Sequence, residues 1–136
     1  MILVDTSVIV AWLDPTHPEH RACSQALDDW GAVDELAVSS VTFAELAAGG
    51  RNRQALDEDL RGFIEVELGF DAAFRAGQAF GRCHPGKREN KPVLPDFLIR
   101  GQASALGVPH LTNDRRQLQA FPEIDFRFPG DAAVGG

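Results

Sequence analysis

The sequence predicts an α/β protein, a three-layer α/β/α sandwich around a mostly parallel sheet. Two patterns predict it: short apolar runs of strand length alternate with segments of helical periodicity, and prolines and glycines separate these segments at regular intervals. Strands separated by helices require right-handed crossovers, which cover both faces of a parallel sheet. At 136 residues the chain is long enough for one hydrophobic core.

The first half of the chain consists of short apolar runs and helical segments closed by breakers. We predict strands at residues 2–5 and 35–40, and helices at residues 8–13, 17–31, 41–50 and 51–62. Pro15, Gly31 and the Gly49–Gly50 pair end the first three helices, because proline cannot continue a helix and glycine favours its end. The last of these helices has a polar face.

The second half repeats the alternation around one proline-rich segment. We predict strands at residues 63–68, 108–112 and 124–128, helices at residues 71–83 and 95–107, a short helix at residues 113–121, and a loop at residues 84–95. Three prolines and a glycine mark the loop. From Pro129 the chain is rich in small residues, so we expect one domain over 1–128 and a flexible tail over 129–136.

Bulk composition excludes several classes of protein. The formal net charge of −7 argues against a protein that coats nucleic acid through a generally basic surface. No apolar run approaches the roughly 20 residues of a membrane span, and the first residues lack the features of a signal peptide. Cys23 and Cys83 lie far apart outside any metal-binding motif, which favours reduced thiols. We therefore expect a cytoplasmic protein that does not associate with membranes.

Four acidic residues fall where a parallel sheet would bring them together. Asp5 ends the first strand, Asp114 follows the strand at 108–112, Asp96 opens the helix before that strand, and Glu45 lies one helical turn past the second strand. Ligands of open parallel sheets bind beyond the carboxyl ends of the strands. The topology thus directs four carboxylates to one edge.

Each acid also has a structural interpretation. Asp5 could end a strand in water, Asp96 could favour a helix N-terminus, and Asn113 or Asp114 could cap a helix. Glu45 fits a capping box with Thr42. Against this, Glu45 is the only charge in the otherwise apolar segment VSSVTFAELAAGG, and Asp5 ends a strand that should be central.

Convergence of the acids would require cations. Carboxylates a few ångströms apart raise one another's pKa, so several remain ionised at neutral pH only with positive charge between them. Hard oxygen ligands without cysteine favour Mg²⁺ or Mn²⁺, one or two ions per site. Such ions suit phosphate chemistry.

The sequence resembles the PIN-domain ribonucleases, and especially the VapC-type toxins of toxin-antitoxin pairs. The resemblance is carried, in order over about residues 1–128, by VDTSVIVAWLD, SSVTFAELAAG, PDFLIRGQASALGVPHLTND and IDF. Two departures stand out. Pro95 precedes Asp96 where many relatives carry two acids, and Arg100 with Gly101 replaces the small alanines usual in that helix.

The resemblance implies an activity and its parts. The metal ligands would be Asp5, Glu45, Asp96 and Asp114, with Ser7 contacting the site and Asn113 orienting the fourth carboxylate. The reaction would be metal-dependent hydrolysis of RNA that leaves a 3′-hydroxyl and a 5′-phosphate. The implied partners are the RNA substrate, a VapB-type antitoxin and a second copy of the chain in a homodimer.

Basic residues and two histidines are further candidates for a functional role. Candidate RNA-binding residues are Lys87, Arg88, Lys91, Arg115 and Arg116. A solvated charged loop explains the first three equally well, and exposed positions on a short helix explain Arg115 and Arg116 equally well. His17 and His20 have a spacing that can bind zinc on a helix, but they fit exposed residues at a helix start better.

Three alternatives to a toxin nuclease stay open. An aspartyl-phosphate phosphotransferase or phosphatase would use Asp5 as nucleophile, although the sequence lacks an aspartate two residues later. A stand-alone RNA-processing PIN nuclease would share the same acids. A non-catalytic binding module would keep them without turnover.

Overall fold

A five-stranded parallel sheet forms the centre of the protein, as predicted. A computed structural model describes residues 1–86 and 92–131. Its strands are β1 (Ile2–Val4), β2 (Leu36–Ser39), β3 (Ile64–Val66), β4 (His110–Leu111) and β5 (Phe126–Arg127). Their order across the sheet is β3-β2-β1-β4-β5, and each neighbouring pair is parallel.

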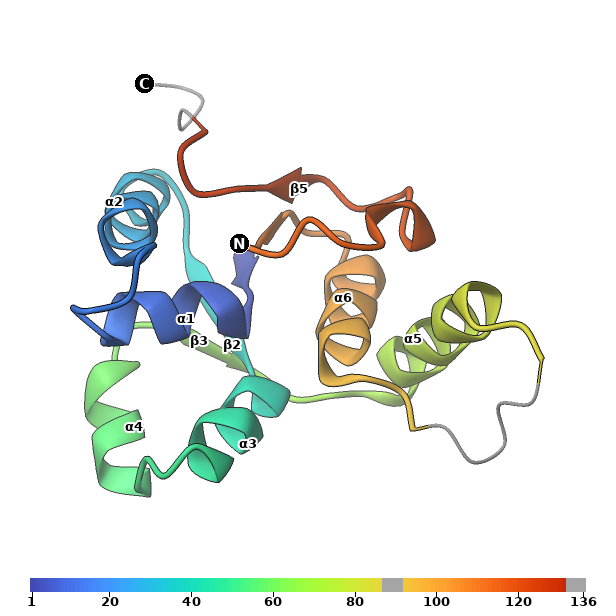
Figure 1. Cartoon of the computed structure of the whole chain (residues 1–136), viewed down its shortest axis with the longest axis horizontal. Coiled ribbons are helices and arrows are strands. Elements are labelled where there is room, and N and C mark those ends of the chain that lie inside the picture. Colours follow the sequence, from blue (N-terminus) through green and yellow to red (C-terminus); the bar gives the residue numbers. More distant parts are fainter. Residues whose placement is uncertain (87–91, 132–136) are drawn as a thin grey trace.

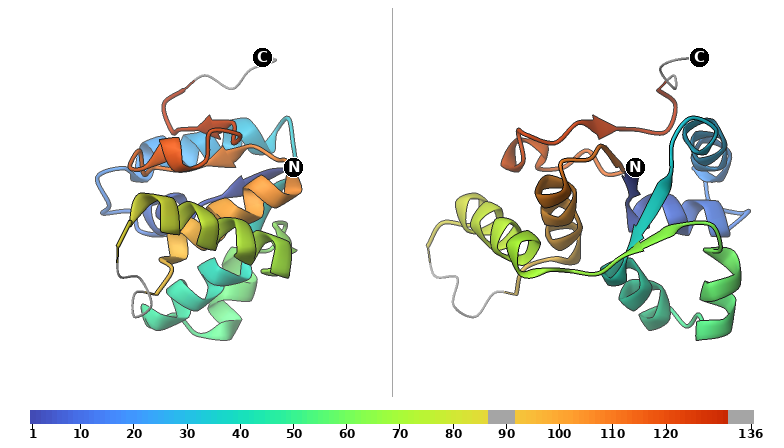
Figure 2. Two further views of the ribbon diagram at one scale, coloured as in Figure 1. Left: turned by 90° about the vertical axis from the view of Figure 1, so that its right-hand side faces the viewer. Right: turned by 180° about the vertical axis from the view of Figure 1, so that it is seen from behind.

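Helices cover both faces of this sheet, which confirms the predicted fold class. They are α1 (Thr6–Leu13), α2 (His20–Gly31), α3 (Ser40–Ala48), α4 (Arg53–Asp59), α5 (Phe70–Cys83), α6 (Pro95–Leu106) and a 3₁₀ turn, η1 (Leu118–Ala120). Figure 1 shows α1 and α2 on one side of the strands and α5 and α6 on the other, and the two further views in Figure 2 agree. Within the described residues, no helix is long and apolar enough to span a membrane.

Strand β1 is apolar at every position because it is buried on both faces. Ile2 and Val4 pack into the core formed with α1 and α2, while Leu3 packs into the core formed with α5 and α6. All three are fully buried. A central strand covered by helices on both sides reads as a continuous apolar run. The carboxylate that ends this run is therefore held at the centre of the sheet edge.

Helices α5 and α6 pack closely through a glycine. A Cβ built on Gly101 would lie 2.4 Å from the carbonyl oxygen of Ala72 and 2.9 Å from Cβ of Ala76. Glycine weakens a helix interior by about 1 kcal/mol relative to alanine, so its presence here is explained by this contact. Gly101 thus fixes the distance between the two helices.

One predicted element is wrong. Residues 113–121 do not form a helix: residues 113–117 are a turn, and only Leu118–Ala120 is helical. The carboxylate of Asp114 accepts the backbone N–H of Arg116, and the hydroxyl of Thr112 accepts the N–H of Asp114. Such side-chain bonds to the backbone compete with helix formation. The predicted loop over 84–95 is described only outside residues 87–91.

Candidate metal-binding site

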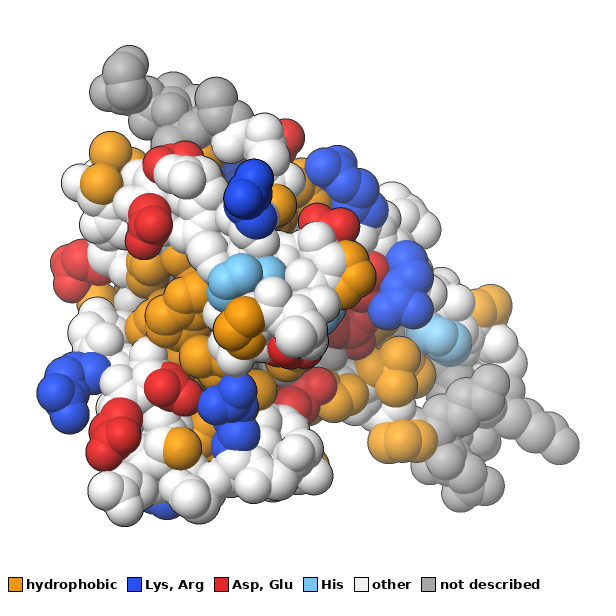
Figure 3. All heavy atoms as spheres, turned by 60° about the vertical axis from the view of Figure 1, so that its left-hand side comes forward, with side chains coloured by type: hydrophobic (Ala, Val, Ile, Leu, Met, Phe, Trp, Pro, Cys, Tyr) orange, Lys and Arg blue, Asp and Glu red, His pale blue; other side chains and the backbone are white. Residues whose placement is uncertain are grey.

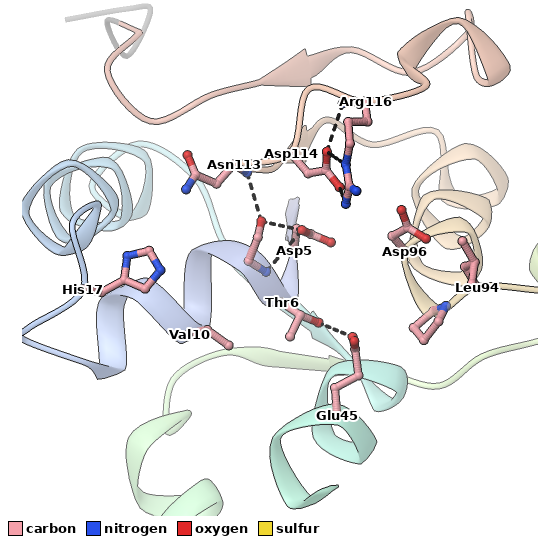
Figure 4. Close-up of a pocket in the computed structure, with 12 residues that line it drawn as sticks. Asp5, Thr6, Val10, His17, Glu45, Leu94, Asp96, Asn113, Asp114 and Arg116 are labelled. Atoms are coloured by element: carbon pink, nitrogen blue, oxygen red, sulfur yellow. Dashed lines mark hydrogen bonds and ion pairs between the residues drawn. The ribbon is translucent and has the colours of Figure 1, made fainter. Parts of the chain in front are cut away.

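A pocket of about 450 Å³ opens at the carboxyl edge of the sheet. It is lined by Asp5, Thr6, Ser7, Val10, His17, Glu45, Leu94, Pro95, Asp96, Asn113, Asp114 and Arg116. All four predicted metal ligands are in this set, together with Ser7 and Asn113. Figure 4 shows the four acids reaching the pocket from β1, α3, α6 and the turn after β4. The topology therefore brings together residues that lie up to 109 positions apart, from Asp5 to Asp114.

Asp5 both caps a helix and lines the pocket. It is the N-cap of α1, and its Oδ2 accepts hydrogen bonds from the N–H and hydroxyl of Ser7 and, at 3.1 Å, from the hydroxyl of Thr112. Its Oδ1 lies 3.7 Å from Nε2 of the buried His110. Three hydrogen bonds to one oxygen fix the orientation of the carboxylate. The capping role and a role in the pocket are thus compatible.

Glu45 is held by a hydroxyl from the first helix. Thr6 donates a 2.7 Å hydrogen bond to its Oε1, and the Thr6 hydroxyl also lies 2.8 Å from the hydroxyl of Thr42. The cap of α3 is Ser39, so the capping-box interpretation of Thr42 and Glu45 is wrong. Burial raises the pKa of Glu45, and the charges of Asp5 and Asp96 raise it further against the opposing effect of the Thr6 hydrogen bond.

Asp96 lies in the first turn of α6, directly after Pro95. Its Oδ1 accepts the N–H of Phe97 at 2.9 Å. An anion at this position is stabilised by the positive end of the helix dipole. The side chain is half-buried, lines the same pocket as Glu45, and its charge contributes to raising the pKa of Glu45.

Asp114 is paired with an arginine. Its two oxygens accept hydrogen bonds of 2.9 and 2.8 Å from Nε and Nη2 of Arg116, whose side chain is 83% exposed. This hydrogen bonding lowers the pKa of Asp114, and the charge of Arg100 adds to the effect. The N–H of Asn113 donates a 3.0 Å hydrogen bond to the Ser7 hydroxyl. The backbone of Asn113 thus links the turn after β4 to α1.

The donor set suits a hard divalent ion. Carboxylate oxygens predominate, and the mutual repulsion of Asp5, Glu45 and Asp96 is the kind that a cation relieves. Across the parts of the chain that the structure describes, no three His, Cys, Asp or Glu side chains lie close enough to share one ion. Mg²⁺ usually keeps several waters, so ligands around a pocket of this size need not converge on the ion directly.

Basic side chains lie next to the acids. Figure 3 shows acidic side chains in a recess with arginine or lysine side chains beside them. Arg115 is exposed, and its guanidinium stacks 3.8 Å from the ring centroid of Phe128. Lys87, Arg88 and Lys91 lie outside the described residues.

The two histidines considered for zinc are separated by their contacts. His17 lines the acidic pocket, and its Nδ1 accepts the N–H of Glu19. Nδ1 of His20 lies 3.0 Å from the carbonyl oxygen of Ala11. Among the described residues, these two histidines form no group of three or more His, Cys, Asp or Glu side chains that could hold a metal ion.

Three residues of the site's support were missed from the sequence. Thr6 and Thr112 orient acids across the pocket, and Arg100 bonds to the backbone of the Asp114 turn. Thr6 could have been predicted, because its hydroxyl directly follows Asp5 at the end of the first strand. Arg100 stood out in the sequence as a departure from the small alanines of similar proteins, but its partners in the Asp114 turn were not predictable; nothing local marks Thr112.

Comparison with known proteins identifies the family. A family model described as PIN domain matches residues 2–126. The chain belongs to the PIN domain family. No curated protein matches the sequence.

Solved structures share the fold of this PIN domain at low sequence identity. A chain of VapBC2 from Rickettsia felis, bound to a promoter DNA fragment, is 21% identical with a TM-score of 0.68, covering 94% of this chain and 98% of that one. A chain of a toxin-antitoxin complex from Klebsiella pneumoniae is 22% identical with a TM-score of 0.68, covering 91% of this chain and 95% of that one. A chain of VapBC-1 from nontypeable Haemophilus influenzae is 19% identical with a TM-score of 0.69, covering 94% of this chain and 98% of that one. The likeness therefore extends over nearly the whole chain.

Proposed function

We propose that this PIN domain is a metal-dependent endoribonuclease and the toxin of a type II toxin-antitoxin pair. The observation that carries the proposal is the lining of one pocket by Asp5, Glu45, Asp96 and Asp114, four acids from four separate segments of a PIN domain. We propose these four as ligands of one or two Mg²⁺ or Mn²⁺ ions. When bound, the ion would lower the pKa of a coordinated water and offset charge on the scissile phosphate.

The protein's own residues would orient the ligands and the substrate. Ser7 and Thr112 hold Oδ2 of Asp5, and we propose that Oδ1, which lies 3.7 Å from Nε2 of His110, is the oxygen that would bind the ion. Thr6 holds Glu45. The exposed Arg116 lines the pocket with the acids, and we propose that its guanidinium and that of the neighbouring Arg115 bind phosphates of an RNA strand. Lys87, Arg88 and Lys91 are proposed to extend this contact.

The proposed partners follow from the fold relatives. The similar structures from Rickettsia felis and Klebsiella pneumoniae are a VapBC complex and a toxin-antitoxin complex. We therefore propose a VapB-type antitoxin as protein partner, a homodimeric toxin, and a cytoplasmic location. Copurification with the product of an adjacent small gene, and light scattering of the purified chain, test the two assemblies.

The function is tested by Asp5→Asn. The substitution keeps an acceptor for Ser7 and Thr112 but removes the charge, so we expect a folded protein whose Mn²⁺-dependent RNA cleavage falls by at least about 100-fold, beyond what loss of an outer-shell partner costs. Asp57→Asn, at an exposed ion pair on α4, is the control and should cleave as wild type does.

The product ends identify the reaction. A 5′-phosphate and 3′-hydroxyl on RNA fragments, with loss of cleavage in EDTA, support metal-dependent hydrolysis. Undiminished cleavage by Asp5→Asn, free of contaminating nuclease, contradicts the proposal. A trapped phosphoryl-enzyme at Asp5 would instead favour phosphotransfer.

A further inference from the structure

Arg100 is a cation buried without a carboxylate partner. Its side chain is 1% exposed, and no ion pair within the described residues involves it. Its guanidinium instead donates hydrogen bonds of 2.8 Å to the carbonyl of Arg116 and 3.0 Å to the carbonyl of Asp114, and lies 5.2 Å from the ring centroid of Phe126. Burying an unpaired charge is costly. Its presence here therefore calls for a role.

The two carbonyls define that role. They belong to the two ends of the three-residue turn that begins with Asp114. A guanidinium presents several donors in a rigid planar fork, so one side chain can hold both carbonyls at a fixed separation, which the single ammonium of lysine cannot reproduce. Arg100 therefore fixes the backbone that carries the Asp114 carboxylate.

The position of Arg100 on α6 connects this turn to a second acid. Asp96 and Arg100 are four residues apart, so they lie on the same face of the helix. One helix thus carries both a carboxylate of the pocket and the side chain that fastens the turn bearing another. Arg100 thus links the helix that carries Asp96 to the turn that carries Asp114.

We propose that Arg100 is a positioning residue that holds the Asp114 turn at a fixed distance from Asp96. The proposal rests on the proposed function in one respect only, that these acids bind a divalent ion. Two other roles are possible for a buried arginine. It could act only through its charge on the acids, or it could only fill the core.

Two variants separate these roles. Arg100→Lys keeps the charge and loses the fork, while Arg100→Met loses both and keeps an unbranched chain. Arg75→Met is the matched control, because Nη1 of Arg75 donates to the hydroxyl of Ser104 at 3.2 Å, near the opposite end of α6. Circular dichroism establishes that each variant is folded.

Amide hydrogen exchange in metal-free protein tests the hold on the turn. We expect protection of the Asp114 and Arg116 amides, relative to that of Leu3 in β1, to fall by at least about tenfold in both Arg100 variants and to stay unchanged in Arg75→Met. Protection equal to wild type in Arg100→Lys would overturn the proposal. This readout does not require metal binding.

Calorimetric titration with Mn²⁺ tests the consequence for the site. Positioning predicts that both Arg100 variants bind Mn²⁺ about 10- to 100-fold more weakly than wild type. A role through charge alone predicts unchanged affinity in Arg100→Lys and tighter binding in Arg100→Met. A role in the core alone predicts lower Tm with unchanged affinity, and either result would overturn the proposal.

The two proposals fail in different ways. Absence of Mn²⁺ binding to wild-type protein would count against the proposed function, while the exchange data would still decide whether Arg100 holds the turn. Normal wild-type binding that Arg100→Lys leaves unchanged would count against the positioning role alone.

Discussion

The hydroxyl of Thr6 donates a 2.7 Å hydrogen bond to Oε1 of Glu45, a residue 39 positions further along the chain. This bond stabilises the ionised carboxylate, but burial and the charges of Asp5 and Asp96 outweigh it and raise the pKa of Glu45 above its ordinary value of 4.5. The site thus keeps a carboxylate in surroundings that disfavour its charge. Functional sites commonly contain groups with perturbed pKa values, and such groups lower the stability of the fold.

We predict that Glu45→Gln stabilises the metal-free protein at neutral pH. An acid with a raised pKa binds more protons when folded, so its ionisation destabilises the fold as pH rises from 4.5 through the raised pKa. Glutamine keeps an acceptor for Thr6 and removes the charge. Thermal unfolding in EDTA should give a higher Tm than wild type at pH 7, and the difference should shrink below pH 4.5.

The control for this prediction is Glu35→Gln, which changes an exposed glutamate and should stay within about 0.5 kcal/mol of wild type. A Tm of Glu45→Gln at or below that of wild type at pH 7 would show that the acids do not repel one another as described.

Divalent ions should stabilise the wild-type protein. A ligand that binds only the folded state at 100 times its Kd adds about 2.7 kcal/mol, which in a domain of this size raises Tm by on the order of 10 °C. Differential scanning fluorimetry with and without Mn²⁺ measures the shift, and EDTA should reverse it. Asp5→Asn should reduce the shift strongly, whereas Asp57→Asn should keep it. An equal shift in both variants would place the ion elsewhere.

Arg116 should compete with the metal for Asp114. Both oxygens of this carboxylate accept hydrogen bonds from the guanidinium, whose 83% exposure lets solvent weaken the pair. Arg116→Ala is therefore expected to tighten Mn²⁺ binding by up to about 5-fold. Arg53→Ala removes an exposed ion pair on α4, outside the lining of the pocket, and should leave the affinity unchanged. Weaker binding in Arg116→Ala would mean that Arg116 supports the site.

The same variant tests the electrostatics of the turn. The hydrogen bond from Arg116 lowers the pKa of Asp114, so in metal-free Arg116→Ala this pKa should rise, as measured by NMR titration of the side-chain carboxyl. In wild type, the stability that the ionised Asp114 contributes should be present above pH 3.8 and lost as pH falls through its lowered pKa. An unshifted pKa in the variant would contradict the ion pair.

Gly101→Ala should destabilise the fold by about 1–3 kcal/mol. The added methyl would meet the Ala72 carbonyl at 2.4 Å and force α5 and α6 apart, a cost that exceeds the gain in helix propensity. Gly77→Ala is the matched control in α5, where a Cβ meets nothing within 4 Å, and it should stabilise by about 0.5–1 kcal/mol. Urea unfolding of both variants measures the contrast, and equal behaviour would rule out the close contact.

The order of strands and helices was predictable because each element is marked locally. Apolar runs, helical spacing and breakers involve residues within one segment, and parallel strands with helices between them leave few possible arrangements. The same reasoning brought Asp5, Glu45, Asp96 and Asp114 to one edge, since strand ends of a parallel sheet share that edge. Their role as metal ligands remains a prediction.

The contacts that orient these acids are visible only in the folded protein. The pairing of Thr6 with Glu45, the fork of Arg100 on the Asp114 turn and the fit of Gly101 against Ala72 join segments far apart in sequence. Residues 113–117 form a turn rather than the predicted helix because side-chain bonds to the backbone prevail there. Local patterns record which residues a segment would bury, whereas a hydrogen bond between distant groups exists only after the sheet has brought them together.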